Sequence, residues 1–219
     1  MIELSVGFNQ NEKYASLIKK LQVLATEKEI NKAITKAAKK AASEARKETL
    51  SLIPGAYTIP VSEVKSSIKV QAIRGSNPGA IMRITSGVFS LYEFGGVTPR
   101  EVMPPSKGPV RAAVKQGGGS ELGHAFIAKM KGGHIGVFER EETKRKSMDS
   151  HGRTYNKIKK NGKWVENKAH VHIQELFGPS VPGMFGMEKE NPINTAVIKR
   201  TGEIFNELVI VELEALLNV

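Results

Sequence analysis

Apolar and polar residues alternate strictly over residues 2–8, and this period of two predicts a strand with one buried face. A short helix is expected over residues 14–24. Thr26 and Glu29 follow at the spacing of a capping box, in which each side chain bonds the backbone N–H of the other residue. We therefore expect a long helix to begin there and to run to about Leu52.

The long helix should bury a stripe of small residues. Its apolar positions recur at helical spacing and are mostly alanine, so a neighbouring element can approach closely: Ile30, Ala33, Ile34, Ala37, Ala38, Ala41, Ala42 and Ala45. Lysines dominate the opposite face. Pro54-Gly55 is expected to end the helix, because proline cannot continue it and glycine tolerates the reversal of the chain.

Short strands should fill the middle of the chain. Alternating or apolar runs predict strands over residues 68–74, 80–85, 88–94, 110–115, 125–130, 135–140 and 169–173. A short helix, residues 61–67, should precede them. Asn191 as N-cap and Pro192 in the first turn predict a last helix over residues 192–217.

These elements predict an α+β fold. We expect a largely antiparallel sheet of short strands, packed by the long N-terminal-half helix and the C-terminal helix, with an exposed basic insertion. The length of 219 residues suits a single domain. Its expected parts are a strand and short helix (1–25), helix plus strands (26–142), the insertion (143–168), and a strand, apolar segment and helix (169–219).

Composition narrows the classes of function. The 33 Lys+Arg against 22 Asp+Glu give a net charge of +11, which favours acidic partners such as nucleic acid or an acidic protein surface. The lack of cysteine excludes a disulfide scaffold, a thiol nucleophile, a Cys-based zinc site and an iron–sulfur cluster. No apolar run approaches the roughly 20 residues of a membrane span, and no signal peptide is evident at the N-terminus. We expect a soluble intracellular chain without membrane contact.

Candidate chemistry is sparse. His170 and His172 would share one strand face, and His124 or His134 could join them to form a metal site of a hydrolase. No carboxylate stands at ligand spacing beside the pair, so a solvent-facing strand is favoured. The chain has no Gly-x-Ser-x-Gly motif, and the glycine-rich residues 117–123 lack the Gly-Lys-Ser/Thr of a P-loop. We expect no catalytic residue, metal or cofactor.

The basic insertion, residues 143–168, carries nine basic and two acidic residues, hence +7 of the net charge. Its candidate contact residues are Lys144, Arg145, Lys146, Arg153, Lys157, Lys159, Lys160, Lys163 and Trp164. Such residues can contact phosphates, and Trp164 with Tyr155 can stack on bases. A charged arm that only stays solvated is the alternative.

An apolar segment with two prolines, residues 176–185, forms the other unusual feature. Pro179 and Pro182 argue against helix and against central strand. The segment either folds onto its own core or faces a neighbouring subunit. Its candidate interface residues are Leu176, Phe177, Pro179, Val181, Pro182, Met184 and Phe185.

Two stretches resemble the minor tail protein Z family of long-tailed bacteriophages. Residues 124–140 (HAFIAKMKGGHIGVFER) are similar to the family pattern AF-x-A-x-M-x-x-G-H-x-G-V-F-x-R. Residues 173–182 (IQELFGPSVP) are similar to I-x-E-L-[YF]-G-P-S-V-P. The resemblance covers most of residues 27–217. Residues 1–25 and the basic insertion depart from it.

The resemblance implies a structural virion protein that acts in tail completion and head–tail joining, assembled in the host cytoplasm. It implies no enzyme and no cofactor. Its expected place is the head-proximal end of the tail tube, in a ring with six copies as the expected number, in contact with tail tube and neck or connector proteins. In this setting the apolar segment is the candidate contact between subunits of the hexamer. DNA would pass nearby in the tail lumen, so the basic insertion is expected to face outward. A nucleic-acid-binding protein remains the alternative.

Overall fold

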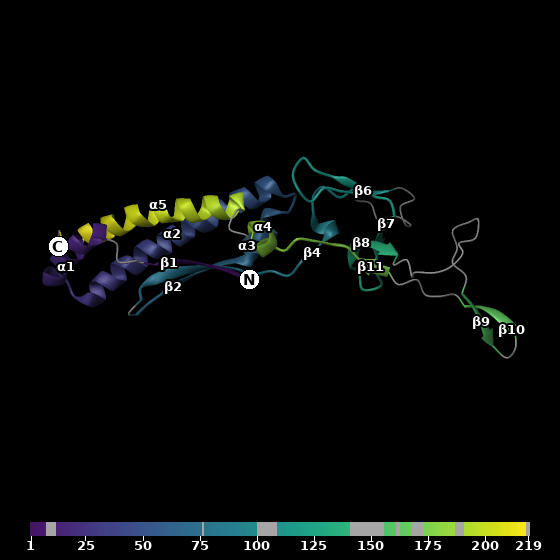
Figure 1. Cartoon of the computed structure of the whole chain (residues 1–219), viewed down its shortest axis with the longest axis horizontal. Coiled ribbons are helices and arrows are strands. Elements are labelled where there is room, and N and C mark those ends of the chain that lie inside the picture. The colour runs from purple at the N-terminus through teal and green to yellow at the C-terminus, as the bar shows by residue number, and fades with distance from the viewer. Residues whose placement is uncertain are drawn as a thin grey trace.

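The computed structural model describes residues 1–7, 12–75, 77–99, 109–140, 156–160, 163–167, 173–186 and 191–217. Helices and strands form two layers at one end of an elongated molecule, and small sheets lie towards the other end (Figure 1). The helices are α1 (Glu12–Leu24), α2 (Glu27–Ala56), α3 (Val61–Ser67), α4 (Val181–Phe185) and α5 (Pro192–Glu214). The α+β class predicted from the sequence is confirmed.

The predicted capping box starts α2. The Thr26 backbone N–H donates to Glu29 Oε2 at 2.8 Å, and the Glu29 N–H donates to Thr26 Oγ1 at 3.4 Å. All eight residues of the predicted apolar stripe, from Ile30 to Ala45, are buried. The small alanine side chains let both α5 and the first sheet lie close against α2.

The predicted end of α2 was wrong, because the helix continues through Pro54 to Ala56. A proline in the last turn removes only one hydrogen bond, and the segment after β5 supplies other donors to the helix end. The Gln116 N–H donates to the Ala56 carbonyl at 2.9 Å, and Gln116 Nε2 donates to the Pro54 carbonyl at 3.2 Å. Contacts about 60 residues away in sequence therefore set this boundary.

The first sheet has the order β1–β3–β2 and packs against α2. Its strands are β1 (Ile2–Gly7), β2 (Ile68–Ile73) and β3 (Gly79–Ile84), and both pairings are antiparallel. The strands predicted over 68–74 and 80–85 pair as a hairpin, and these strands and the predicted N-terminal strand are thus confirmed. Along β1, Ile2, Leu4 and Val6 face inward and Glu3 and Ser5 face solvent, as the alternation requires.

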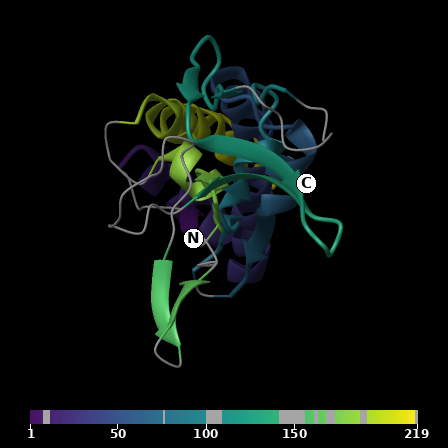
Figure 2. The ribbon, with the colours of Figure 1, turned by 90° about the vertical axis from the view of Figure 1, so that its right-hand side faces the viewer.

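The remaining strands form separate small sheets instead of one large one. The described residues include a three-stranded sheet, order β11–β8–β7, and the pairs β12–β4, β5–β6 and β10–β9, all antiparallel. Their bounds are β4 (Phe89–Ser90), β5 (Val110–Ala112), β6 (Ser120–Leu122), β7 (Ala125–Lys129), β8 (Ile135–Arg140), β9 (Asn156–Lys160), β10 (Lys163–Asn167), β11 (Ile173–Glu175) and β12 (Phe177–Gly178). Most are too short to extend a common sheet, and a 3₁₀ turn, Leu91–Glu93, interrupts the expected strand over 88–94. The second view shows β9–β10 projecting away from the body (Figure 2).

A short helix, α4, replaces the irregular structure expected around Pro182. Ser180 caps it by accepting a hydrogen bond from the Gly183 N–H at 3.2 Å. Pro182 stands in the first turn, where its missing N–H has no intrahelical partner to lose. The last helix begins as predicted, since Asn191 Oδ1 accepts from the Ile193 N–H at 3.0 Å.

Two apolar clusters make up the core. One joins the small sheets to the middle of the molecule, and its largest fully buried side chains include Phe94, Phe185 and Met82. The other lies between the alanine stripe of α2 and the inner face of α5, which carries Phe205 and Val209. No helix within the described residues is long and apolar enough to cross a membrane.

Candidate interaction surfaces

The two motif stretches meet in the three-stranded sheet. β11 pairs with β8, so Ile173 lies opposite Arg140 and Glu175 opposite Phe138. The pairing continues past β11, since the Leu176 N–H donates to the Val137 carbonyl at 2.8 Å. Segments separated by the whole basic insertion therefore form one structural unit.

One side-chain contact joins the turn of the β7–β8 hairpin to β11. His134 Nε2 lies 2.8 Å from Glu175 Oε1, with 52% of the His134 side chain exposed against 17% for Glu175. Gly136 makes room for the carboxylate, because a Cβ at this position would lie 2.6 Å from Glu175 Oε1. The His134 ring also stands edge-on to the ring of Phe138. His134, Gly136 and Glu175, all motif residues, thus serve one contact.

A second carboxyl group, that of Glu93, lies near this contact. Burial raises the pKa of Glu93, and the neighbouring carboxylates of Glu63 and Glu175 raise it further, while His134 acts to lower it. Glu93 ends the 3₁₀ turn that follows β4. The titratable residues at this corner of the molecule therefore come from four elements: α3, the 3₁₀ turn, the β7–β8 hairpin and β11.

The chain after β11 crosses from one sheet to another. The Leu176 carbonyl accepts from the Leu91 N–H at 2.9 Å, and Phe177 pairs with Ser90 through β12 and β4. Gly178 then passes directly over the ring of Phe94, where a Cβ would lie 2.3 Å from a ring carbon. The Gly-Pro of this motif thus serves a close approach of backbone to a buried aromatic ring.

The candidate interface residues of the apolar segment divide by burial. Val181, Pro182, Met184 and Phe185 are buried in the core of this chain. Leu176 and Pro179 are half-buried, and Phe177 is 54% exposed. Of this segment, Phe177 therefore offers the largest apolar side chain to a neighbouring molecule.

Only the backbone of two strands of the basic insertion is described. β9 and β10 place Trp164 opposite Lys159, Lys163 opposite Lys160, and Lys157 opposite Glu166. Lys144, Arg145, Lys146 and Arg153 lie outside the described residues. A solvated hairpin arm is one of the two interpretations of this segment, and the Asn161-Gly162 pair between the strands is a strong hairpin signal in the sequence, but no strand bounds were predicted here.

The histidines proposed as metal ligands are not brought together among the described residues. His134 pairs with Glu175, and His124 is exposed in the turn before β7. His151, His170 and His172 lie outside the described part of the chain. That part contains no group of three or more metal-ligating side chains.

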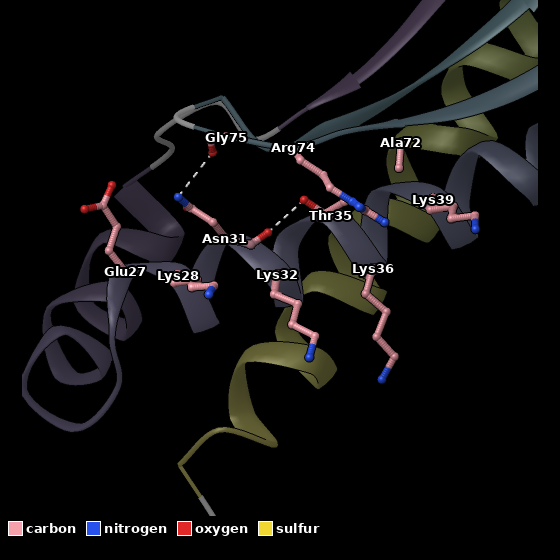
Figure 3. A pocket seen from close by; sticks show the side chains of 10 residues that line it. All are labelled: Glu27, Lys28, Asn31, Lys32, Thr35, Lys36, Lys39, Ala72, Arg74 and Gly75. Carbon is pink, nitrogen blue, oxygen red and sulfur yellow. Dashed lines mark hydrogen bonds between the residues drawn. The ribbon is translucent and has the colours of Figure 1, made fainter.

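A basic groove runs between the first half of α2 and the end of β2. Lys28, Lys32, Lys36 and Lys39 line it from the helix, and Arg74 lines it from the strand side (Figure 3). The sequence indicated the lysine face of this helix. Nothing in the local pattern showed that Arg74 and Gly75, some 40 residues later, lie beside that face.

Glu212 of α5 neutralises part of the lysine face. Its carboxylate lies 2.7 Å from Lys36 Nζ and 2.6 Å from Lys40 Nζ, and its side chain is only 10% exposed. Burial acts to raise the pKa of Glu212, but hydrogen bonds from the two lysines outweigh burial and lower it. This bridge links α2 to α5 on the surface of the second apolar cluster.

Comparison with known proteins agrees with the motif resemblance. The sequence profile of the prophage minor tail protein Z (GPZ) family matches residues 10–153, more than half of the chain. This match includes the β7–β8 motif, whereas residues 173–182 lie beyond it. Neither a curated protein nor a solved structure matches the chain. On the strength of the profile match, the chain belongs to the prophage minor tail protein Z family and is a minor structural protein of a phage tail.

Proposed function

We propose that this chain is a tail-completion subunit that closes the head-proximal end of the tail tube and joins tail to head. It acts without catalysis, as a ring of copies that contact tail tube and neck or connector proteins. Membership of the minor tail protein Z family carries the proposal. The two motif stretches also support it. Their residues His134, Gly136 and Glu175 hold each other in place, which is a structural role.

The proposed ring contact includes the edge formed by β4 and β12. Phe177 on β12 is 54% exposed, and Val88, just before β4, is 62% exposed. The outer edge of a two-stranded sheet such as β4–β12 presents backbone N–H and C=O groups that can hydrogen-bond to another chain. A head-to-tail contact of this kind closes into a ring when the rotation between copies is right, and six copies are the expected number.

The basic insertion is assigned to an outward or axial neighbour and not to the channel. DNA must slide through the tail lumen, and a band of lysines lining it would hold the phosphates. A density map in which residues 157–163 line the bore would overturn this placement. Nucleic-acid binding by the basic insertion is the second candidate, favoured by the +7 charge of residues 143–168. A steep loss of DNA affinity with added salt would support it.

Electron microscopy of particles made without this protein tests the main proposal. We expect tails that remain unjoined to heads or joined particles that do not infect, both restored by the gene in trans. Infectious head-joined tails of normal appearance would contradict it. The position of the gene beside tail-tube or neck genes provides an independent check.

A further inference from the structure

The groove between α2 and β2 is a hollow of about 810 Å³. Figure 3 shows it with the helix on one side and the end of the strand on the other. Its lining residues are Glu27, Lys28, Asn31, Lys32, Thr35, Lys36, Lys39, Ala72, Arg74 and Gly75. None of the family motif residues lies in it, so the contacts of the motifs do not account for it.

The charge of the groove is strongly positive and largely unneutralised. Among the described residues, five cationic side chains line it against one carboxylate, Glu27. Lys36 is paired with Glu212. Within the described ranges, the other four cations form no ion pair. Repulsion among these cations favours an acidic occupant.

Hydrogen bonds between α2 and the end of β2 fix the shape of the groove. Asn31 Nδ2 donates to the Gly75 carbonyl at 3.3 Å. The Thr35 hydroxyl shares its proton between the Asn31 carbonyl at 2.8 Å and the Ile73 carbonyl at 3.3 Å. These bonds join the helix to the strand end within the lining of the groove, to which the small side chain of Ala72 also belongs. A preformed site loses little conformational freedom when a partner binds.

The spacing of the lysines fits an extended polypeptide. Lys28, Lys32 and Lys36 are four residues apart, so they repeat at about 6 Å along the helix. Alternate side chains of an extended strand repeat at about 6.6 Å on one face. Carboxylates at every second position of such a strand would therefore meet Lys28 and Lys32 in succession, and a third would reach Lys36 beside Glu212.

We propose that this groove binds an extended acidic segment of another protein, with Asp or Glu at alternate positions. A nucleic acid fits less well. Among the described residues, the lining has no aromatic side chain on which a base could stack, which is the usual contact of single strands. A duplex is too broad to enter a hollow of this size and would meet only the outermost lysines.

Binding of a short synthetic peptide of alternating glutamate and threonine, measured by fluorescence anisotropy on the full chain at low ionic strength, tests the proposal. The groove variant carries Lys32→Glu and Lys39→Glu. The matched control carries Lys131→Glu and Lys199→Glu, at exposed positions outside both the groove and the basic insertion, with the same change in net charge. We expect the groove variant to weaken binding by about tenfold or more and the control by less than about threefold.

Equal losses in both variants would overturn the groove assignment, as would no binding to the wild type. Single-stranded or duplex DNA that displaces the peptide from the wild type at equal or lower concentration would also overturn it, in favour of a nucleic-acid site. If the charge-reversed groove variant does not fold, Lys32→Gln with Lys39→Gln replaces it. The expected loss is then about threefold or more. The result does not depend on ring formation or on the role in tail completion.

Discussion

His134 Nε2 lies 2.8 Å from Glu175 Oε1, which joins the β7–β8 turn to β11 across 41 residues of sequence. Each residue belongs to a different motif of the family pattern. The pair gives a physical reason for both motifs, since the histidine needs its carboxylate and the carboxylate needs the open space at Gly136. The two motif stretches of this chain therefore meet at this contact.

A double-mutant cycle measures this dependence. Gly136→Ala should displace the Glu175 carboxylate from His134, so Gly136→Ala and Glu175→Ala remove the same interaction. Urea unfolding of the wild type, both single variants and the double variant should give losses that fall short of additivity by about 0.5–1 kcal/mol. Fully additive losses would show that the glycine serves another contact, such as the Phe138 ring.

Gly178→Ala should be strongly destabilising. Its Cβ would lie 2.3 Å from a carbon of the Phe94 ring, which is fully buried and cannot move aside. We expect a loss of about 1–3 kcal/mol in the free energy of unfolding. Gly202→Ala on the exposed face of α5 is the control, where nothing lies within 4 Å and a gain of up to about 1 kcal/mol is expected. Similar effects in both variants would contradict the close packing at Gly178.

Alanine variants at Phe177 and Phe185 should distinguish a loss of assembly from a loss of stability. Phe177→Ala should change the free energy of unfolding by less than about 1 kcal/mol, because the side chain is half exposed. If Phe177 contacts a neighbour, the infectious titre of phage carrying this variant should nevertheless fall by about tenfold or more. Phe185→Ala, at a buried position, should cost about 3–5 kcal/mol.

The control for Phe177 is Val211→Ala, an exposed apolar position on α5. It should leave both stability and titre nearly unchanged. A normal titre for Phe177→Ala would remove this residue from the proposed ring contact.

Acid should weaken the bridge between α2 and α5. The pKa of Glu212 in the folded protein is below its ordinary value of 4.5, so its carboxylate stabilises the fold above pH 4.5. This contribution is lost as the pH falls through the lowered pKa. Near neutral pH, Glu212→Gln should be less stable than the wild type by about 1–2 kcal/mol.

The difference for Glu212→Gln should shrink as the pH falls below 4.5. Glu214→Gln, on an exposed position of the same helix, is the matched control and should show a much smaller loss near neutral pH. Thermal unfolding across a pH series measures both variants. A gap that stays constant into acid would contradict the assignment of the bridge.

Local sequence signals predicted the features that depend on a few neighbouring residues. Thr26 with Glu29, Asn191 with Pro192, and the alternation of β1 each act within a few residues, and the structure confirms all three. The α+β class followed from their order. The pairing of the two motif stretches needed more, because no local pattern says that residue 173 returns to residue 140.

The errors have long-range or positional causes. α2 continues past Pro54 because Gln116, far along the chain, bonds its last carbonyls. α4 forms because Ser180 and Pro182 stand at its start, where proline is tolerated. The groove could not be foreseen, since Arg74 reaches the lysine face only through the packing of β2 on α2.

The register of β8 and β11 places the two ends of the basic insertion side by side. The basic insertion leaves the fold after Arg140 and returns at Ile173, and these two residues are partners across the ladder. Because both ends are anchored side by side, each doubling of the length between them costs only about 0.6 kcal/mol of chain entropy. The length and sequence of this insertion can therefore change at little cost to the stability of the sheet that carries it.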